Sequence, residues 1–397
     1  MLYQQSTCFV KSLDWDENRL AWLILAWFDG FGSKSLQKLS RQFRQDGERA
    51  LRATTEDLRE LGIRTNTIER FFRYQQTADV TTYLKQLERD DIRFILIDDK
   101  DYPQLLREIN DPPFALFQRG ATINSGQPCV TVVGTRNITP YGKHVTTTLC
   151  TELVRAGYCT ASGLAFGVDA TAHEATLDAR GITIAVLGGG CDDDTIYPRE
   201  HVALAHRLLK SGGTIISEMP PGTEPMRHHF PLRNRILAGL SPTTVVVEAA
   251  EASGSLITAH AALNYNREVF AVPGPITSVQ SKGTNTLIGM GATPYLGPET
   301  IVRAERKEIT VDRTGRGTTR PGVTTRVTPT EENMTAEEMI VAKALHEPLS
   351  IDELTRKIQR PSTSISMILL QLEMRGIIDD LGGKRYQLRG SFHPTSD

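Results

Sequence analysis

The sequence contains few cysteines and no long apolar segment. Its five cysteines, among 397 residues, are scattered, and no two of them form a CxxC pair. This pattern favours reduced thiols in a cytoplasmic protein over a disulfide framework or a zinc site. No apolar run approaches the roughly 20 residues that a membrane-spanning helix needs, and the first residues do not resemble a signal peptide. The cysteines are Cys8, Cys129, Cys150, Cys159 and Cys191.

An excess of charge of either sign is also lacking. The formal net charge is −2, and the contents of 39% hydrophobic and 23% charged residues are ordinary for a globular protein. Overall charge therefore gives no sign of a nucleic-acid partner, and a site for one would have to be a local basic patch. The length is sufficient for two or three domains with a large core.

Short apolar runs, each followed by a loop of small residues, fill the middle of the chain. Runs such as 129–133, 183–187 and 214–217 have four or five residues and are rich in β-branched side chains. Because helix-like segments alternate with them, we expect an α/β fold with a parallel sheet and helices on both faces. Ligands of such sheets bind at the carboxyl ends of the strands, where helix N-termini attract anions. The predicted phosphate-binding edge includes Gly134, Thr135 and Arg136, then Ser162, Gly163 and Gly167, and finally Ser253, Gly254 and Ser255.

Two of these loops have specific chemistry. Arg136 follows a predicted strand, and a guanidinium there can hold a phosphate through two hydrogen bonds, although an ion pair to a neighbouring helix would also explain it. The spacing Ser162-Gly163-x-x-x-Gly167 resembles half of a dinucleotide-binding fingerprint, with an apolar strand before it and a helix after it. Asp169 in the first turn of that helix is explained by capping or by the helix dipole.

The segment 227–235 is the densest basic stretch of the central region. It can neutralise phosphates beside an aromatic ring, a combination that suits single strands because their bases offer a free π-face. Phe230 could equally belong to the core. The adjacent histidines His228 and His229 lack the partners that a metal site requires. The candidate residues are Arg227, Phe230, Arg233, Asn234 and Arg235.

The loop after the last clear strand has two compatible explanations. Ser253 and Ser255 precede a predicted helix at 256–264, and small hydroxyl residues there suit both N-capping and phosphate binding. Glu248 at the strand end could be a catalytic carboxylate, but no His, Lys or nucleophile stands at a convincing spacing.

Smaller units flank the central region. Residues 14–80 contain paired short helices joined by Gly-containing turns, which resemble SAM or helix–hairpin–helix modules; a helical packing module is the alternative. We place the sheet domain at 81–304. Residues 305–333 are rich in Thr, Arg, Gly and Pro without periodicity, which predicts a flexible linker.

The tail, 334–390, is predicted to fold as a winged helix. Three helical segments precede a hairpin at 377–388 with a Gly-Gly turn. The third helix begins with hydroxyl residues where a recognition helix would meet DNA, but it carries little positive charge there. A protein-binding or structural role for the tail is therefore an equal alternative.

In their order along the chain, these segments resemble the DNA-processing protein A family (DprA, also called Smf). The resemblance covers the central domain nearly continuously, and family members often carry both flanking units. It rests on motifs that include Gly134-Thr135-Arg136, Ser162-Gly163-Leu164-Ala165-x-Gly167-Val168-Asp169, Ile196-Tyr197-Pro198, Phe230-Pro231-x-Arg233-Asn234-Arg235-Ile236, Ser253-Gly254-Ser255 and Val272-Pro273-Gly274.

The resemblance implies an extended Rossmann-like domain that binds single-stranded DNA, forms a homodimer and loads the recombinase RecA during transformation or recombination. Arg136 and Arg227 would hold phosphates, Phe230 would contact a base or sugar, and Asn234 would line the pocket together with the Ser162–Gly163 loop. The family is not enzymatic, and no cofactor or metal is implied. One departure is the acidic loop Asp192–Asp194, whose carboxylates would repel a phosphate track, so we do not expect it to touch DNA.

Two rival functions use the same features differently. Related Rossmann-like enzymes hydrolyse nucleoside monophosphates, and Glu248 would be the catalytic acid in such a site. The Pro-Gly-Gly-x-Gly-Thr string of those hydrolases is absent, however. A winged-helix regulator of duplex sites would need more basic residues on the third helix of the tail. The single-strand binder is the function that the sequence favours.

Overall fold

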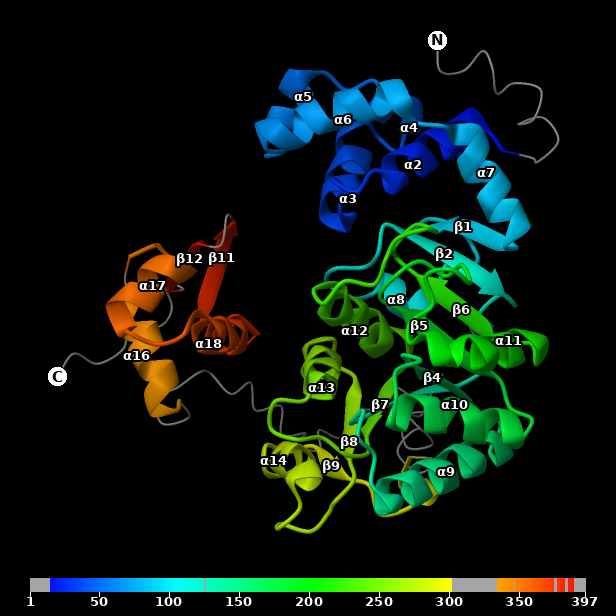
Figure 1. The fold of residues 1–397 in the computed structure, drawn as a ribbon, viewed down its shortest axis with the longest axis vertical. Coiled ribbons are helices and arrows are strands. Elements are labelled where there is room, and N and C mark those ends of the chain that lie inside the picture. Colours follow the sequence, from blue (N-terminus) through cyan, green and yellow to red (C-terminus); the bar gives the residue numbers. More distant parts are fainter. Residues whose placement is uncertain are drawn as a thin grey trace, which may run out of the picture. The chain divides into compact units, whose positions relative to one another are not determined.

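The computed structural model describes residues 15–301, except 125, and residues 334–388, except 346, 375–376 and 383–384. The chain divides into two compact units, Met1–Val311 and Asp312–Asp397 (Figure 1). The predicted linker at 305–333 lies outside the described residues, as do Cys8 and part of the predicted Gly-Gly turn.

Short capped helices open the first unit. Asp16 accepts a hydrogen bond from the Arg19 N–H and begins the first of them, and Thr54 and Asp57 form a capping box at another. Polar residues at these caps explain why such short segments begin where they do. The helices are α2 (Glu17–Trp27), α3 (Ser33–Gln42), α4 (Gly47–Leu51), α5 (Thr55–Glu60), α6 (Thr65–Thr77) and α7 (Val80–Arg89).

These helices share a core with the sheet that follows. Trp22 packs on Phe114 with ring centroids 4.8 Å apart, and Trp27 meets Phe117 edge-on at 5.7 Å. All four aromatic residues belong to one apolar cluster or pack against it. The helical module is therefore part of the first unit rather than a separate body.

A nine-stranded sheet forms the centre of this unit, in the order β1-β2-β6-β5-β4-β3-β7-β8-β9. In this spatial order, the strands β6, β5, β4, β3, β7, β8 and β9 are mutually parallel, as expected. At one edge, β2 pairs antiparallel with β6, and β1 pairs antiparallel with β2. The strands are β1 (Ile92–Leu96), β2 (Ala115–Gly120), β3 (Cys129–Val133), β4 (Cys159–Ser162), β5 (Thr183–Leu187), β6 (Thr214–Ser217), β7 (Thr243–Val246), β8 (Glu268–Ala271) and β9 (Thr293–Pro294).

Helices cover both faces of the sheet, because side chains along each strand alternate between them. Val130 and Val132 on β3 pack in the cluster that contains α9 and α10. Cys129 and Val133 on the same strand join the cluster of α8, α12 and α13. The helices are α8 (Gln104–Arg107), α9 (Pro140–Arg155), α10 (Val168–Asp178), α11 (Val202–Lys210), α12 (His229–Leu240), α13 (Gly254–Asn264) and α14 (Lys282–Gly289).

The chain reverses its direction across the sheet beside β3. From β3 it proceeds through β4, β5 and β6 on one side, then returns to place β7 directly against β3 and continues outward to β8. The chain therefore leaves β3 and β7 toward opposite faces of the sheet, to α9 on one face and α13 on the other. Such a switch point is where open α/β sheets bind ligands.

The second unit has the predicted winged-helix elements and its own core. Ser350 and Glu353 form a capping box that begins α17, and Leu354 of that helix packs with Ile365 and Leu369 of α18. The elements are α16 (Ala336–Ala344), β10 (Leu349–Ser350), α17 (Ile351–Ile358), α18 (Ser362–Met374), β11 (Ile378–Gly382) and β12 (Arg385–Leu388), with β12 paired to both other strands.

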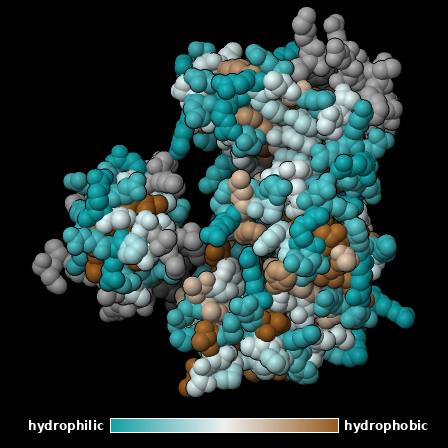
Figure 2. Space-filling model, in the orientation of Figure 1, coloured by the Kyte–Doolittle hydropathy of each residue, from teal (hydrophilic) through white to brown (hydrophobic). Residues whose placement is uncertain are grey.

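Side chains at the surface of the first unit are mixed in character. On the face shown in Figure 2, hydrophobic side chains form separate small patches between hydrophilic ones. Among the described residues, no helix has the length and apolarity to cross a membrane.

Candidate nucleic-acid interface

Backbone hydrogen bonds join the loops that follow β3, β4 and β7. The Thr135 N–H donates to the Glu248 carbonyl at 2.7 Å, and the Val168 N–H donates to the Thr135 carbonyl at 3.1 Å. Gly167 has a φ of 76°, and a Cβ at this position would lie 2.2 Å from the Thr135 carbonyl oxygen. Only glycine fits this conformation and this approach. The half-fingerprint predicted from sequence is therefore part of a rigid edge.

Arg233 lies beneath this edge rather than on it. Its side chain is buried, and Nη1 donates to the Gly163 carbonyl at 2.6 Å and also to the Val186 carbonyl. Asp169 Oδ2 accepts from the Gly163 N–H at 3.1 Å. Arg233 and Asp169 thus hold the carbonyl and the N–H of Gly163 in place, and Ser162 is tied to β3 through its hydroxyl, 2.6 Å from the Val132 carbonyl.

Burial changes the protonation equilibria of this pair. Burial lowers the pKa of the Arg233 guanidinium, and the nearby Asp169 carboxylate opposes that change. Burial also raises the pKa of Asp169, against the influence of Arg233 and of backbone N–H groups. The opposite charges stabilise one another in a place that water does not reach. This arrangement supports a positioning role for both residues.

The exposed part of the edge combines a guanidinium with aromatic rings. Arg136 is exposed, and its guanidinium carbon lies 5.3 Å from the centre of the half-buried Phe230 ring. Arg227 is exposed in the loop before α12. Within residues 15–301, no described carboxylate forms an ion pair with Arg136 or Arg227. Both guanidinium groups are therefore available to an anionic ligand.

Two aromatic residues extend this surface beyond the sequence prediction. Tyr197 is 45% exposed with its ring 6.1 Å from that of Phe230, and Phe166 is 40% exposed with its ring 4.9 Å from His201. Both stand inside motifs that were identified in the sequence, but exposure is not visible there. We name Arg136, Phe166, Tyr197 and Phe230 the edge cluster.

The Ser253-Gly254-Ser255 loop lies beside Asn234. The buried Asn234 amide donates to the Gly254 carbonyl at 3.0 Å, and Ser253 caps α13 by accepting from the Ser255 N–H at 3.4 Å. A Cβ at Gly254 would meet no atom of the described residues within 4 Å, so the described part of the chain leaves open space above it. The geometry thus supports the capping explanation and leaves this helix start accessible.

Arg235 has internal partners. Its Nη2 donates to both carboxylate oxygens of Glu218 at 2.6 Å, and Nη1 donates to the Asp111 carbonyl. Glu218 also accepts a hydrogen bond from the Ser33 hydroxyl at the start of α3. Arg235 therefore joins α12, the end of β6 and the helical module, and direct DNA contact by this residue stays a prediction.

The acidic loop turns most of its charge inward. Asp192 is fully buried, and its Oδ2 accepts from the Gly222 N–H at 2.7 Å and the Thr195 hydroxyl at 2.8 Å. Asp193 pairs with Arg119 at 2.5 Å and His206 at 2.7 Å. Burial raises the pKa of Asp193, but these hydrogen bonds outweigh it and hold the pKa below its usual value. Of the three carboxylates in this loop, mainly that of Asp194 therefore remains to repel the phosphates of a DNA strand.

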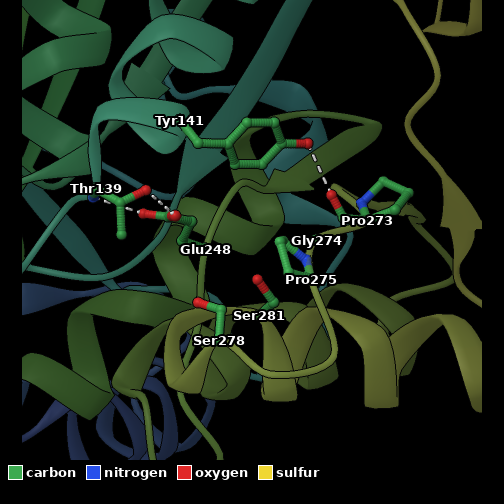
Figure 3. Close-up of a pocket in the computed structure, with 8 residues that line it drawn as sticks. All are labelled: Thr139, Tyr141, Glu248, Pro273, Gly274, Pro275, Ser278 and Ser281. Carbon is green, nitrogen blue, oxygen red and sulfur yellow. Dashed lines mark hydrogen bonds between the residues drawn. The ribbon is translucent and has the colours of Figure 1, made fainter.

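Glu248, the candidate acid of the rival hydrolase, has a structural partner. It is 2% exposed, and its two carboxylate oxygens accept from the Thr139 hydroxyl at 2.5 Å and the Thr139 N–H at 2.9 Å. It also lines a pocket shown in Figure 3. Neither histidine, lysine nor cysteine lines this pocket in the described part of the chain, and no group of three potential metal ligands was found among those same residues.

Comparisons with protein families give two matches. Residues 93–306 match the family described as DNA recombination-mediator protein A, and residues 325–384 match the DprA winged helix domain.

Named relatives agree with these matches. DNA processing protein DprA of Bacillus subtilis is 39% identical over 70% of this chain and 88% of that protein. Protein Smf of Synechocystis is 34% identical over 93% of this chain and 98% of its own length. The X-ray structure of DNA processing protein A from Streptococcus pneumoniae superimposes with a TM-score of 0.63 at 31% identity, covering 73% of this chain and 98% of that one.

Proposed function

Because this chain belongs to the DNA recombination-mediator protein A (DprA/Smf) family, we propose that it binds single-stranded DNA along the carboxyl edge of its sheet. The observation that carries the proposal is the edge cluster. Its guanidinium lies over an aromatic ring, and two further exposed rings stand on neighbouring loops. Stacking on unpaired bases and neutralisation of phosphates can therefore occur side by side.

The rigid support beneath the edge favours this function. Arg233, Asp169 and Gly163 fix the loop after β4, and the interlocked backbone fixes the loop after β3. A strand that binds such a preformed surface does not have to order it first, so less binding free energy is lost. The residues proposed for direct contact are Arg136, Arg227, Phe230 and Tyr197, together with the loop at Gly254.

We further propose that the bound strand is delivered to RecA and that the protein acts as a homodimer in the cytoplasm. The family membership supports a role in DNA processing for transformation or recombination. Cys150 and Cys191 are buried thiols, which suits a reducing compartment. Assembly of RecA on strands already coated by single-strand-binding protein would measure delivery, and sedimentation would measure the oligomeric state.

Fluorescence anisotropy tests the binding site. Wild type should prefer labelled oligo-dT to a matched duplex, with affinity that falls as salt rises. The double variant Arg136→Ala/Arg227→Ala should bind more weakly, and its salt dependence should be shallower by roughly 0.7 in log–log slope for each phosphate that is no longer neutralised.

A charge-matched control separates this site from general electrostatics. Arg155 and Lys210 lie in the last turns of α9 and α11, near the opposite edge of the sheet. Arg155→Ala/Lys210→Ala removes the same charge and should leave the salt slope unchanged. Equal slopes for the two double variants would move the DNA site away from the carboxyl edge.

The enzymatic alternative places chemistry at Glu248. Both of its oxygens are engaged by Thr139. Among the described residues, the only other ionisable side chain in the lining of its pocket is Tyr141, whose hydroxyl donates to the Pro273 carbonyl. We therefore propose binding without hydrolysis. Release of free base from a nucleoside monophosphate by the purified protein would contradict this.

A further inference from the structure

A pocket separate from the edge cluster opens on the other side of the switch point. It has a volume of about 430 Å³ and is formed where β7 and β8 end and α9 begins. Glu248 follows β7, Pro273 follows β8, and Thr139 and Tyr141 lie at the start of α9. The volume falls within the range of small-molecule sites.

The walls of this pocket are braced from outside. The Asn285 side chain holds both backbone groups of Gly274, donating to its carbonyl at 3.0 Å and accepting from its N–H at 3.3 Å. The Ala249 N–H donates to the Gln280 carbonyl at 2.7 Å. The Tyr141 hydroxyl donates to the Pro273 carbonyl at 2.8 Å. The pocket is therefore preformed, and its aromatic ring is held in one position.

The chemistry of the lining is specific. In Figure 3 the Tyr141 ring lies along one side, Ser278 and Ser281 stand across from it, and Glu248 with Thr139 closes a third side. A carboxylate offers about four acceptor positions, and Thr139 occupies one on each Glu248 oxygen. Glu248 is 2% exposed, so the small part of its carboxylate that faces the pocket can accept a hydrogen bond from a ligand that carries N–H or O–H donors.

These features select a flat ligand that carries no negative charge inside the pocket and has hydrogen-bond donors at its rim. An aromatic ring fixed on one side suits stacking with a second planar ring. Of the residues that the structure describes, a carboxylate and no cationic side chain line the pocket, so a phosphate would be repelled from the interior. A nucleoside unit fits both conditions, because its base stacks, its amino, imino and hydroxyl groups donate, and any phosphate can remain outside.

We propose that this pocket binds a nucleoside unit, with the base against Tyr141 and donor groups directed to Glu248. The unit could be a free nucleoside or one nucleotide of a bound strand. Thr139 stands three residues after Arg136 on the same loop, so a strand on the edge cluster passes close to the pocket. The strand version rests on the proposed function, whereas the free-nucleoside version is independent of it.

Calorimetric titration of the full-length protein with deoxycytidine and deoxyguanosine tests the free ligand. Ser278→Leu fills the pocket from a half-buried wall position, and Tyr141→Ala removes the stacking ring. Each should weaken binding by roughly tenfold or more. Tyr141→Phe keeps the ring and loses only the hydroxyl bond to Pro273, so it should bind within roughly threefold of wild type. Loss confined to the alanine variant, with an unchanged unfolding midpoint, assigns the effect to the ring.

A second arm tests the strand. A single 2-aminopurine within oligo-dT should be quenched on binding to wild type. Ser278→Leu should abolish this quenching and weaken oligo-dT binding by roughly tenfold, as the loss of one stacked base would, while the salt slope stays unchanged. Titration of the free nucleoside without quenching assigns the pocket to a free ligand, and quenching alone assigns it to the strand. The proposal is overturned if wild type neither binds the free nucleoside nor quenches 2-aminopurine. It is also overturned if Ser278→Leu and Tyr141→Ala show the same binding and quenching as wild type. The salt slopes of Arg136→Ala/Arg227→Ala report on strand binding separately.

Discussion

Single side chains at the carboxyl edge divide into supports and contacts. Arg233 and Arg235 lie in the same short segment as Arg227, yet the first two are occupied by backbone carbonyls and by Glu218. Arg227 remains exposed. A string of basic residues therefore serves two purposes, and burial decides which residue serves which.

Gly163 provides a direct test of the support. A Cβ there would lie 2.1 Å from Nη1 of the buried Arg233 guanidinium, so Gly163→Ala must displace this group. We expect the free energy of unfolding to fall by about 1–3 kcal/mol, measured by chemical denaturation.

Gly254 supplies the matched control for that substitution. Its Cβ position is open, so Gly254→Ala should change the free energy of unfolding by less than about 0.5 kcal/mol. Similar losses in the two variants would show that the Arg233 contact does not constrain the loop.

Residue roles explain the limits of the sequence prediction. The sequence correctly predicts that these loops follow the carboxyl ends of strands, because Gly and other small residues directly after an apolar run are a local signal. It could not distinguish Arg233 from Arg136, since burial depends on where α12 packs. Tyr197 and Phe166 were missed as surface residues for the same reason: their exposure is set by neighbouring loops distant in sequence.

At the scale of elements, the parallel strands were predictable and the antiparallel strand β2 was not. The run 214–217 coincides with β6, and most parallel strands follow the same simple pattern. The segment 101–120 lacks a clear strand signal in the sequence, but it contains α8 and the antiparallel strand β2. Its prolines obscure the apolar pattern, and strand direction depends on long-range pairing with β6.

The winged helix offers an element-scale prediction. Ser350 begins α17 by accepting from the Glu353 N–H, while Glu353 accepts from the Ser350 N–H and hydroxyl. Ser350→Ala should destabilise the second unit by about 0.5–2 kcal/mol. Hydrogen exchange should report faster opening of α17 with unchanged exchange in β3 to β7, because the two units have separate cores.

Ser364 is the control for this cap. It is exposed on α18, so Ser364→Ala should leave exchange in α17 unaltered. Faster exchange throughout the sheet in Ser350→Ala would mean that the units unfold together.

The first unit should lose stability in acid in part through the buried His173. His173 is fully buried on α10, with Nδ1 2.7 Å from the Thr183 hydroxyl, and burial lowers its pKa to about 3. The unfolded chain binds a proton at this position near pH 6.5, and the folded chain does not. Stability is therefore complete above pH 6.5 and is lost as the pH falls toward 3.

Comparison of unfolding at pH 7 and pH 5 measures this linkage. His173 should contribute a loss of about 2 kcal/mol over that interval, which His173→Asn should remove. His144, exposed on α9, is the control, and His144→Asn should keep the full loss. An equal pH dependence in wild type and His173→Asn would show that protons are taken up elsewhere.

The shared core between the helical module and the sheet has an evolutionary consequence. Phe94, Phe114 and Phe117 are buried in a cluster that also contains Trp22 of α2. If a gene fission separated the module from the sheet, these three rings would face water and form an adhesive surface. We therefore expect a descendant protein that has lost the module to carry polar residues at these three positions.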